Sequence, residues 1–351
     1  MTRRSATFAV AGALLVALVA VASLLPVPYV VYSPGPVEDT LGEWEGEPVI
    51  EIDGAETYPT EGILDLTTVG VTPADRKLNL VSALQAWVDQ DRAVVPRQLV
   101  YPEDITAEES REANAQLLER SQETAKVAAL RKTGHEVAES VVVDSVLDGA
   151  PADGVLMPGD VVVSVDGTTI ATPQDVVDAV RVHSPGETVE FVVQRDDREL
   201  TETIATEAAE DDGRAIVGFS PTIGYEFPVQ VDVNIDDRIG GPSAGMIFAL
   251  AIYDTLTPGA LLDGMHVAGT GEISADGDIG PIGGIEQKIA AASDDGASLF
   301  LAPADNCDEA VGADNGDMRV VRIETLDDAI AAVEAAAAGD TDALPSCAAS
   351  A

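Results

Sequence analysis

The N-terminal stretch of the chain is the feature that most restricts its fold. No charged residue occurs from Ser5 to Val37, and Phe8 to Leu25 is almost wholly apolar. With its flanks, this run is long enough to span the hydrocarbon core of a bilayer, which is about 30 Å thick. We therefore predict a transmembrane anchor helix over residues 1–35. Cleavage of a signal peptide after Ala22 is the alternative, although apolar residues continue beyond that point.

The charge of the chain bears on its partners and its topology. Acidic residues outnumber basic ones by 62 to 19, for a net charge of −43. Binding to the phosphates of nucleic acids depends on Lys and Arg, so this balance argues against a nucleic-acid partner. Arg3 and Arg4 precede the apolar run and supply +2 of the total, which leaves −45 for everything after it. The positive-inside rule then predicts a single-pass protein of the cell membrane, with a cytoplasmic N-terminus and an extracytoplasmic remainder.

The two cysteines, Cys307 and Cys347, both lie late in the chain. In an oxidising compartment they are compatible with one disulfide that closes the C-terminal segment, and two separate thiols are the alternative. The sequence has no CxxC pair, and the HExxH pattern that begins at His135 fails because residue 139 is Glu. We expect no metal site and no metalloprotease chemistry.

The length and the pattern of the chain indicate two domains and an anchor, of overall α+β class. A capping box at Thr106 to Glu109 starts a long amphipathic helix that ends near Gly134. A small β-rich module follows, and a second module then combines strands with Gly-framed helices. The predicted divisions are the anchor (1–35), extracytoplasmic strands and the connecting helix (36–135), the β-rich module (136–206), the α+β module (229–338) and a tail (339–351).

Ser243 occupies a position with chemical value. It belongs to a Gly-Gly-Pro-Ser-Ala-Gly segment, residues 240–245, that precedes an apolar run of helical length. We expect Pro242 in the first turn of that helix and Ser243 at its N-terminus, where unpaired backbone N–H groups can stabilise an oxyanion. The predicted oxyanion backbone is that of Gly241, Pro242 and Ala244. A GxSxG pattern alone is equally compatible with an ordinary glycine-rich turn.

A reactive serine needs a base. The histidines His135, His183 and His266 do not follow the order of an α/β-hydrolase triad. Lys288, in contrast, lies on a predicted helix that is largely apolar around its amine. Burial lowers a lysine pKa by roughly 3 to 5 units from about 10.4, which is enough to make the amine a base near neutral pH. The alternative is a surface lysine with its amine in solvent.

Three segments resemble, in order and spacing, the motifs of the Lon-type proteolytic domain, over about residues 229–336. They are Gly241–Gly245, Thr270–Ile273, and Pro281–Gly284 with the following Lys288. The resemblance implies that Ser243 is the nucleophile, that Lys288 is its base and that Thr270 orients the lysine. It departs from the family at Gly240, where many Lon domains have Asp, although Asp236 and Asp237 lie upstream. No GxxxxGK[ST] phosphate loop occurs, so we expect no ATPase module and no cofactor.

The β-rich module resembles a PDZ domain of bacterial proteases. The core of the resemblance is Leu156 to Gly167, with Pro158, Gly159, Asp160 and Gly167 at its turns. Such domains bind an extended peptide by strand addition, which implies polypeptide partners. The carboxylate-binding loop is expected just upstream, within residues 134–140. Anchor, PDZ domain and Lon-type domain together resemble the bacterial family of membrane-anchored, PDZ-containing Lon-like proteases.

These features predict an ATP-independent serine endopeptidase that cleaves extracytoplasmic or membrane-proximal polypeptides, with the PDZ domain recruiting or gating the substrates. Two other functions remain open: a non-catalytic PDZ scaffold, and an esterase that pairs Ser243 with His266. Variants at Ser243, Lys288 and His266 distinguish the three. Lon-type domains often form rings, so the resemblance also leaves a homo-oligomer open.

Overall fold

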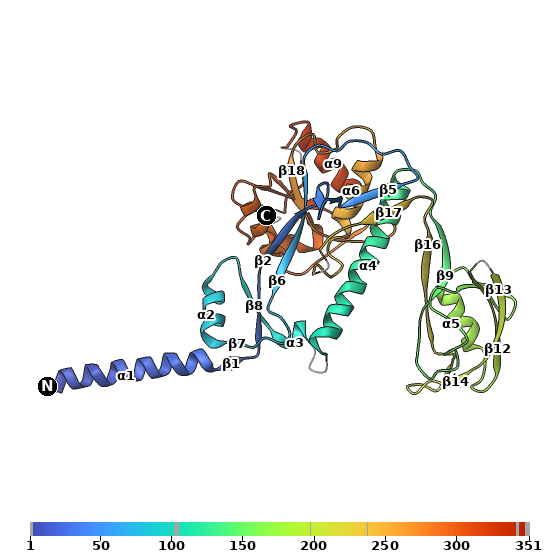
Figure 1. The fold of residues 1–351 in the computed structure, drawn as a ribbon, viewed down its shortest axis with the longest axis horizontal. Coiled ribbons are helices and arrows are strands. Elements are labelled where there is room, and N and C mark those ends of the chain that lie inside the picture. The colour runs from blue at the N-terminus through green and yellow to red at the C-terminus, as the bar shows by residue number, and fades with distance from the viewer. Residues whose placement is uncertain (1–2, 102–104, 197, 237, 342–343, 348–351) are drawn as a thin grey trace. The chain divides into compact units, whose positions relative to one another are not determined.

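The computed structural model describes residues 3–101, 105–196, 198–236, 238–341 and 344–347 (Figure 1). The chain divides into two compact units. The first combines Met1–His135 with Val229–Ala351, and the second is Glu136–Pro228. Because the second unit is inserted between two parts of the first, the chain leaves and re-enters the first unit once.

The first unit begins with the apolar helix α1, Arg3–Leu24. Within the described residues it is the one helix that is long and apolar enough to cross a membrane. The chain after α1 forms the short strand β1 (Pro26–Val27), which pairs antiparallel with β7 (Leu78–Asn79). Helix α2 (Leu80–Val88) packs beside this pair, and a second short helix, α3 (Arg97–Val100), follows later in the chain.

A mixed sheet of six strands forms the centre of the first unit, in the order β22-β21-β18-β6-β2-β8. β18 runs parallel to both β6 and β21, whereas β2 is antiparallel to β6 and to β8. β6 is therefore a central strand of the sheet. The bounds are β2 Tyr29–Asp39, β6 Ile63–Val71, β8 Ala93–Pro96, β18 His266–Gly269, β21 Leu299–Pro303 and β22 Arg319–Ile323.

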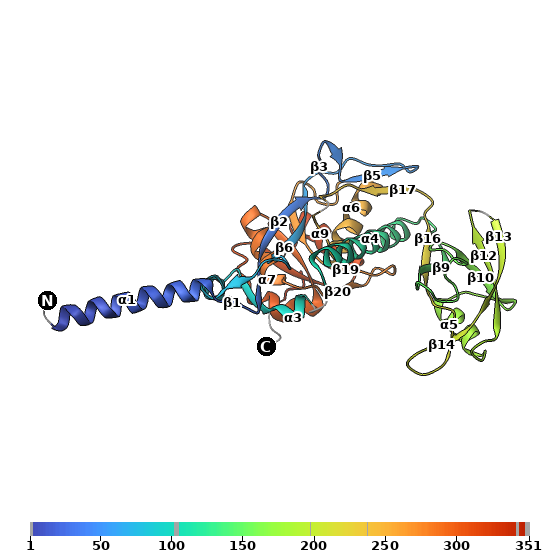
Figure 2. The same ribbon diagram turned by 60° about the horizontal axis from the view of Figure 1, so that its bottom comes forward.

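Helices cover this sheet. The predicted long helix is α4, Ala107–Lys132, and its start has the expected capping box between Thr106 and Glu109. α4 packs along α6, Gly245–Leu256 (Figure 2), and α7, Ile285–Asp295, packs on β2 and β6. The other elements are β3 Glu43–Trp44, β4 Glu47–Pro48, β5 Ile50–Asp53, β17 Gln230–Val233, β19 Glu272–Ile273, β20 Ile279–Gly280, the 3-10 helix Ala304–Asn306, α8 Cys307–Ala310 and α9 Leu326–Ala337.

The division of the chain differs from the one expected from the sequence. Residues 36–135 do not form a region of their own, because β6 lies between β2 and β18 and because β5 pairs with β17. They belong to the same unit as residues 229–351. Strand pairing between distant segments leaves no local signal, so the sequence could not reveal this union.

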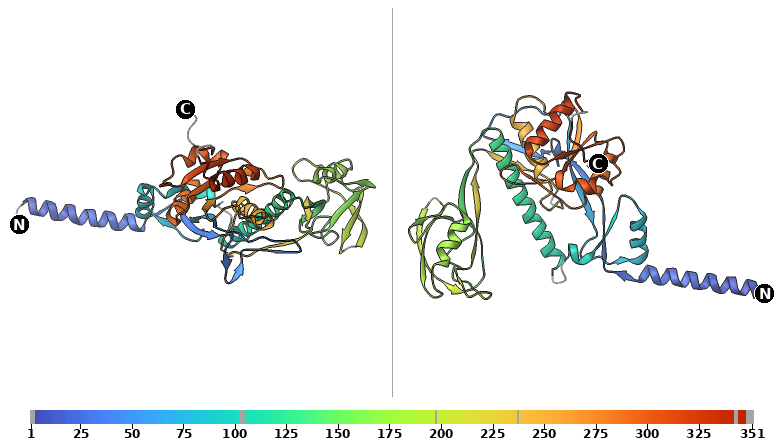
Figure 3. Two further views of the ribbon diagram at one scale, coloured as in Figure 1. Left: turned by 90° about the horizontal axis from the view of Figure 1, so that it is seen from above. Right: turned by 180° about the vertical axis from the view of Figure 1, so that it is seen from behind.

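The second unit is a five-strand sheet, β13-β12-β10-β9-β16, with β11 added to β10. Helix α5 packs beside β16 and β10 (Figure 3). The unit ends at Pro228 rather than at residue 206, because β16 pairs with β9 along its length. The bounds are β9 Ala138–Val146, β10 Val161–Val165, β11 Thr168–Thr169, α5 Pro173–Arg181, β12 Thr188–Arg195, β13 Arg198–Ala205, β14 Glu207–Ala208, β15 Ala215–Ile216 and β16 Phe219–Glu226.

The residues singled out for the β-rich module lie at the ends of β10. Pro158 and Gly159 form the turn before this strand, and Gly167 lies in the turn after it. Asp160 is buried, and its carboxylate accepts two hydrogen bonds of 2.6 Å from the guanidinium of Arg195. A buried charge needs such a partner, so this pair holds β10 to the end of β12.

A disulfide holds the C-terminal segment. Cys307, at the start of α8, is bonded to Cys347, 40 residues later in the chain. Two backbone contacts accompany it: Arg322 N donates to Pro345 O (3.0 Å), and Val321 forms an isolated bridge with Ser346. The segment therefore packs against the edge strand β22.

We expect the double variant Cys307→Ser/Cys347→Ser to be less stable. Closing a loop of 40 residues restricts the unfolded chain, and its removal should lower the unfolding free energy of the first unit by about 4 kcal/mol. Thermal unfolding of the full chain measures the change. A reductant should lower the midpoint of the natural protein equally and leave the double variant unaffected; equal responses of both would contradict the expectation.

Candidate active site

Ser243 lies in the turn that leads into α6 and is half-buried. The helix begins at Gly245, so Pro242 precedes it, and the prediction that Pro242 occupies the first helical turn is wrong. The reason is a tertiary contact. Gly271 N donates to Ser243 O (3.0 Å) and Met246 N donates to Gly271 O (3.1 Å). The segment after β18 thus engages the backbone that would otherwise continue the helix.

Lys288 lies near the start of α7, and its amine meets the hydroxyl of Ser243. Lys288 Nζ donates to Ser243 Oγ at 2.7 Å and to Thr270 Oγ1 at 2.9 Å. The lysine side chain is buried, with 2% of the residue exposed. The structure therefore brings three of the predicted site residues, Ser243, Lys288 and Thr270, into one hydrogen-bonded group.

Thr270 connects the amine to the backbone of the serine. It follows β18 directly, and its hydroxyl donates to Ser243 O at 3.0 Å. Because the hydroxyl proton is used in this bond, the oxygen presents its lone pairs to the amine of Lys288. This arrangement holds the lysine amine in reach of Ser243 Oγ.

Burial lowers the pKa of the Lys288 amine from its ordinary value of 10.5 to about 7. Loss of solvation is the cause, because water that would stabilise the ammonium form is excluded. A substantial share of the molecules consequently carries a neutral amine at neutral pH. A neutral amine can accept the proton of Ser243 Oγ across the 2.7 Å contact and leave an oxygen nucleophile.

The backbone around Ser243 differs from the predicted oxyanion site. Gly241 N donates to Asn114 O (2.9 Å), and Pro242 has no N–H group to offer. Of the predicted set, Ala244 keeps an available donor. Within the described part of the chain, the N–H groups of Ser243 and Ala244 have no acceptor. These two groups are therefore available to donate to an oxyanion that forms next to Ser243 Oγ.

Helix α4 supports the serine turn, which the sequence did not predict. Ser121 Oγ donates to Pro242 O at 2.8 Å, and Asn114 supplies the carbonyl that accepts from Gly241 N. The approach is close: a Cβ on Gly245 would lie 2.7 Å from Ser121 Oγ. The capping box predicted α4, but nothing local indicates that one face of it holds a turn more than 100 residues later.

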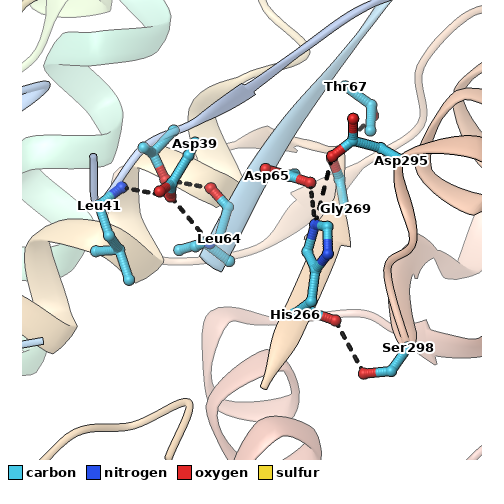
Figure 4. A network of polar contacts seen from close by, with 10 residues as sticks. Asp39, Leu41, Leu64, Asp65, Thr67, His266, Gly269, Asp295 and Ser298 are labelled. Carbon is cyan, nitrogen blue, oxygen red and sulfur yellow. Dashed lines mark hydrogen bonds and ion pairs between the residues drawn. The ribbon is translucent and has the colours of Figure 1, made fainter. Parts of the chain in front are cut away.

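His266 has other partners than the serine. Its Nε2 contacts the buried carboxylate of Asp65 and lies 3.7 Å from that of Asp295 (Figure 4). Burial raises the pKa of the Asp65 carboxyl, and the hydrogen bond with His266 opposes this rise. Among the described residues, these three form the one group whose ligand atoms, within 4.8 Å of one another, could hold a metal ion. The polar network ties β6, β18 and the end of α7 together.

Asp236, upstream of the serine, is already paired with an arginine. Arg238 Nε donates to both of its carboxylate oxygens, at 3.0 and 2.9 Å, and these bonds lower its pKa. Asp237 lies outside the described residues. The acid that many Lon-type domains have at the place of Gly240 thus has no counterpart in Asp236.

The second unit contains a cavity of about 450 Å³ beside α5. It lies between this helix and the segment that leads into the edge strand β16, and two arginines contribute to its wall. Among its lining residues are Val177, Arg181, Arg214, Gly218 and Phe219. A peptide added to the free edge of β16 would extend past this cavity.

Residues 134–140, where a carboxylate-binding loop is expected from the sequence, do not line this cavity. Residues 138–146 form β9, which has strands on both sides and therefore no free edge. The segment at residues 214–218 is the loop that faces the cavity. It is fixed by Gly218, which has a φ of +81° and whose position leaves no room for a Cβ, 2.2 Å from that of Ala150. In the sequence, the signal for this loop was Gly218, a glycine between the apolar residues Val217 and Phe219.

Comparison with known proteins finds a family match within each unit. Residues 237–334 match the model of the Lon protease (S16) C-terminal proteolytic domain, and residues 110–206 match that of the PDZ domain. Lon protease of Paraburkholderia phytofirmans is 43% identical over 94 residues, and that of Campylobacter concisus is 35% identical over 94 residues. Each match covers 26% of this chain and 11% of the relative. The chain thus carries a Lon-type proteolytic domain and a PDZ domain, and matches only about a tenth of the curated relatives' length.

The PDZ match begins inside α4, whereas the compact unit begins at Glu136. Among solved structures, the PDZ domain of an SdrC-like protein from Listeria monocytogenes is 28% identical, covering 23% of this chain and 86% of that chain. Its TM-score is 0.23. With so low a score, the PDZ assignment depends on the family model alone.

The pKa of Lys288 predicts how Ser243 should react. The rate at which a sulfonyl fluoride modifies Ser243 should increase with pH, with its midpoint at about 7, because the neutral amine accumulates above the pKa. Mass spectrometry of the modified peptide gives the rate at each pH. Ser243→Ala should not be modified. A rate that stays constant across neutral pH, or that increases only near the pKa of an ordinary lysine, would contradict this role of Lys288.

Proposed function

We propose that the chain is an ATP-independent serine endopeptidase in which Ser243 is the nucleophile and Lys288 the general base. The observation that carries this proposal is the 2.7 Å contact between Lys288 Nζ and Ser243 Oγ, made by an amine whose pKa is about 7. The Lon-type match over this segment gives independent support.

The reaction follows from these groups. Ser243 Oγ transfers its proton to Lys288 Nζ and attacks the scissile carbonyl carbon, while the N–H groups of Ser243 and Ala244 donate to the oxyanion. The ammonium of Lys288 then protonates the departing amine as the C–N bond breaks. In the second half, water attacks the acyl ester, its proton passes to Lys288, and that proton returns to Ser243 Oγ as the ester bond breaks.

We place the proteolytic unit outside the cytoplasm. Helix α1 supports an anchor in the membrane, and the basic pair before it supports a cytoplasmic N-terminus. The disulfide between Cys307 and Cys347 favours an oxidising compartment, because cytosolic thiols are kept reduced. Substrates would be extracytoplasmic or membrane-proximal polypeptides, and no nucleotide would be needed.

In this proposal the PDZ domain recruits polypeptides. An extended segment would add to the edge of β16, with apolar side chains in the cavity beside α5. Arg181, which lines this cavity, gives a positive contribution in a chain that is otherwise strongly acidic, whereas Arg214 already pairs with Asp212 at 2.9 Å. Arg181 suits the carboxylate of a peptide C-terminus.

The peptidase proposal is tested with the full-length chain in detergent and a denatured protein substrate, without nucleotide. Ser243→Ala should abolish cleavage, and Lys288→Ala should lower kcat/KM by about 10²- to 10⁴-fold, as expected for loss of a general base. Release of peptide fragments with time, followed by mass spectrometry, measures the activity.

His266→Asn is the matched control, since it can still hydrogen-bond Asp65 and should retain activity. Thermal unfolding of each variant verifies that it is folded. Cleavage that survives Lys288→Ala but not His266→Asn would replace the proposal with the esterase-like pairing. An inactive natural protein that still binds polypeptides would favour the scaffold function.

The recruiting role makes a separate prediction. Val177→Asp places a charge in the cavity and should raise KM for the denatured protein by about tenfold, which corresponds to losing ~1.4 kcal/mol of apolar contact. Val182→Asp, at the end of the same helix but outside the cavity lining, is the control. Cleavage of a short peptide that does not bind the PDZ domain should be unchanged in Val177→Asp and in Val182→Asp. Equal KM values for Val177→Asp and the natural protein would contradict recruitment.

A further inference from the structure

Helix α2 exposes its large apolar side chains and buries its small ones, which is the reverse of what a soluble protein normally shows. Leu84, Trp87 and Val88 are 51%, 74% and 76% exposed, whereas Ala83 and Ala86 are buried. The three exposed residues are spaced i, i+3 and i+4, so they share one face of the helix. We call this face the α2 surface. A helix that packs on a core normally buries the large side chains and exposes polar ones.

The α2 surface begins where the anchor ends. β1, directly after α1, pairs with β7, directly before α2. In addition, Leu80 N donates to Leu25 O at 3.1 Å. Backbone hydrogen bonds thus fix the first residue of α2 to the first residue after α1. In Figure 1, α2 runs across the direction of α1 rather than continuing it.

Helix α3 exposes a further apolar side chain. Leu99, in α3, is 77% exposed. Arg97, at the start of α3, donates through its backbone N–H to Pro28 O at 3.0 Å. Both α2 and α3 are therefore held by hydrogen bonds to the four residues that follow the anchor.

The local charge differs from that of the rest of the chain. Residues 72–101 contain four basic side chains, Arg76, Lys77, Arg92 and Arg97, and three acidic ones, Asp75, Asp89 and Asp91. The whole chain has 19 basic and 62 acidic residues. Arg76 and Lys77 are exposed and directly precede β7. Glu103 and Asp104 follow the segment in the sequence, so the part that an anionic surface would attract is the exposed pair Arg76 and Lys77.

We propose that α2 lies in the lipid–water interface of the bilayer that α1 crosses, with the α2 surface in contact with lipid. The inference depends on the anchoring role of α1 proposed above. The exposed tryptophan, the apolar face and the nearby basic residues match the chemistry of an interfacial helix. With α1 across the bilayer and α2 along its surface, the first unit would have two fixed attachments to the membrane.

The two tryptophans of the chain make a direct test available, because they are Trp44 and Trp87. Full-length Trp44→Phe, reconstituted in vesicles of phosphatidylcholine and phosphatidylglycerol, reports on Trp87 alone. Bromine on the acyl chains near the headgroup should quench most of the Trp87 emission, and bromine near the methyl end should quench less. The emission should also be blue-shifted, and quenching at low salt should increase with the phosphatidylglycerol content.

Trp87→Phe is the matched control, since it leaves Trp44 in the β3–β4 hairpin, which we expect neither bromine position to quench. Flotation of the same vesicles separates the two proposals. If the chain floats with the vesicles and Trp87 is not quenched, the interfacial helix is overturned and the anchor stands. If the chain does not float, both are overturned. Blue-shifted but unquenched emission would mean that protein, such as a second copy of the chain, covers the α2 surface.

Discussion

The burial of a single amine, that of Lys288, is the constraint on which the site depends. Burial lowers the pKa of this amine from 10.5 to about 7. Relative to an unfolded chain with a charged amine, this burial costs the folded state on the order of 4 to 5 kcal/mol at neutral pH. That is a large fraction of the stability of an ordinary domain. Among the described residues no acidic side chain forms an ion pair with this amine, and loss of solvation is the cause of the shift. The surrounding structure must therefore be rigid enough to exclude water without help from an ion pair.

The arrangement around Lys288 meets this requirement. Its helix, α7, packs on β2 and β6, two of the inner strands of the sheet. Ile285 and Ile289, on either side of Lys288 in the sequence, are fully buried. Thr270 directs the amine, and the turn that carries Ser243 is held by α4 on one side and by Gly271 on the other. Each of these supports comes from a different segment of the chain. The proposed nucleophile and base are thus positioned by backbone and hydroxyl contacts rather than by charges, which suits a lysine proposed to act in its neutral form.

Local signals in the sequence predicted a good part of this structure. The capping box at Thr106 to Glu109 set the start of α4 correctly, because its hydrogen bonds lie within one turn. The apolar surroundings of Lys288 indicated its burial. What could not be predicted involves contacts between distant segments: the hydrogen bond from Gly241 to Asn114, the displacement of Pro242 from the helix, and the union of residues 36–135 with residues 229–351. The loop beside α5 was missed for the same reason, since β16 returns to pair with β9 from far along the chain.

The insertion of the second unit into the first affects the order in which the protein can fold. Glu136–Pro228 is one continuous segment, so it can fold as soon as it has been synthesised. The sheet of the first unit cannot: β6 must wait for β18, about 200 residues later, and its core is complete only when β21 and β22 are present. Until then Lys288 lacks its buried environment, and we expect its amine to stay charged. Under the proposed mechanism the nascent chain would therefore not attack its own unfolded segments, because the fold itself delays the chemistry.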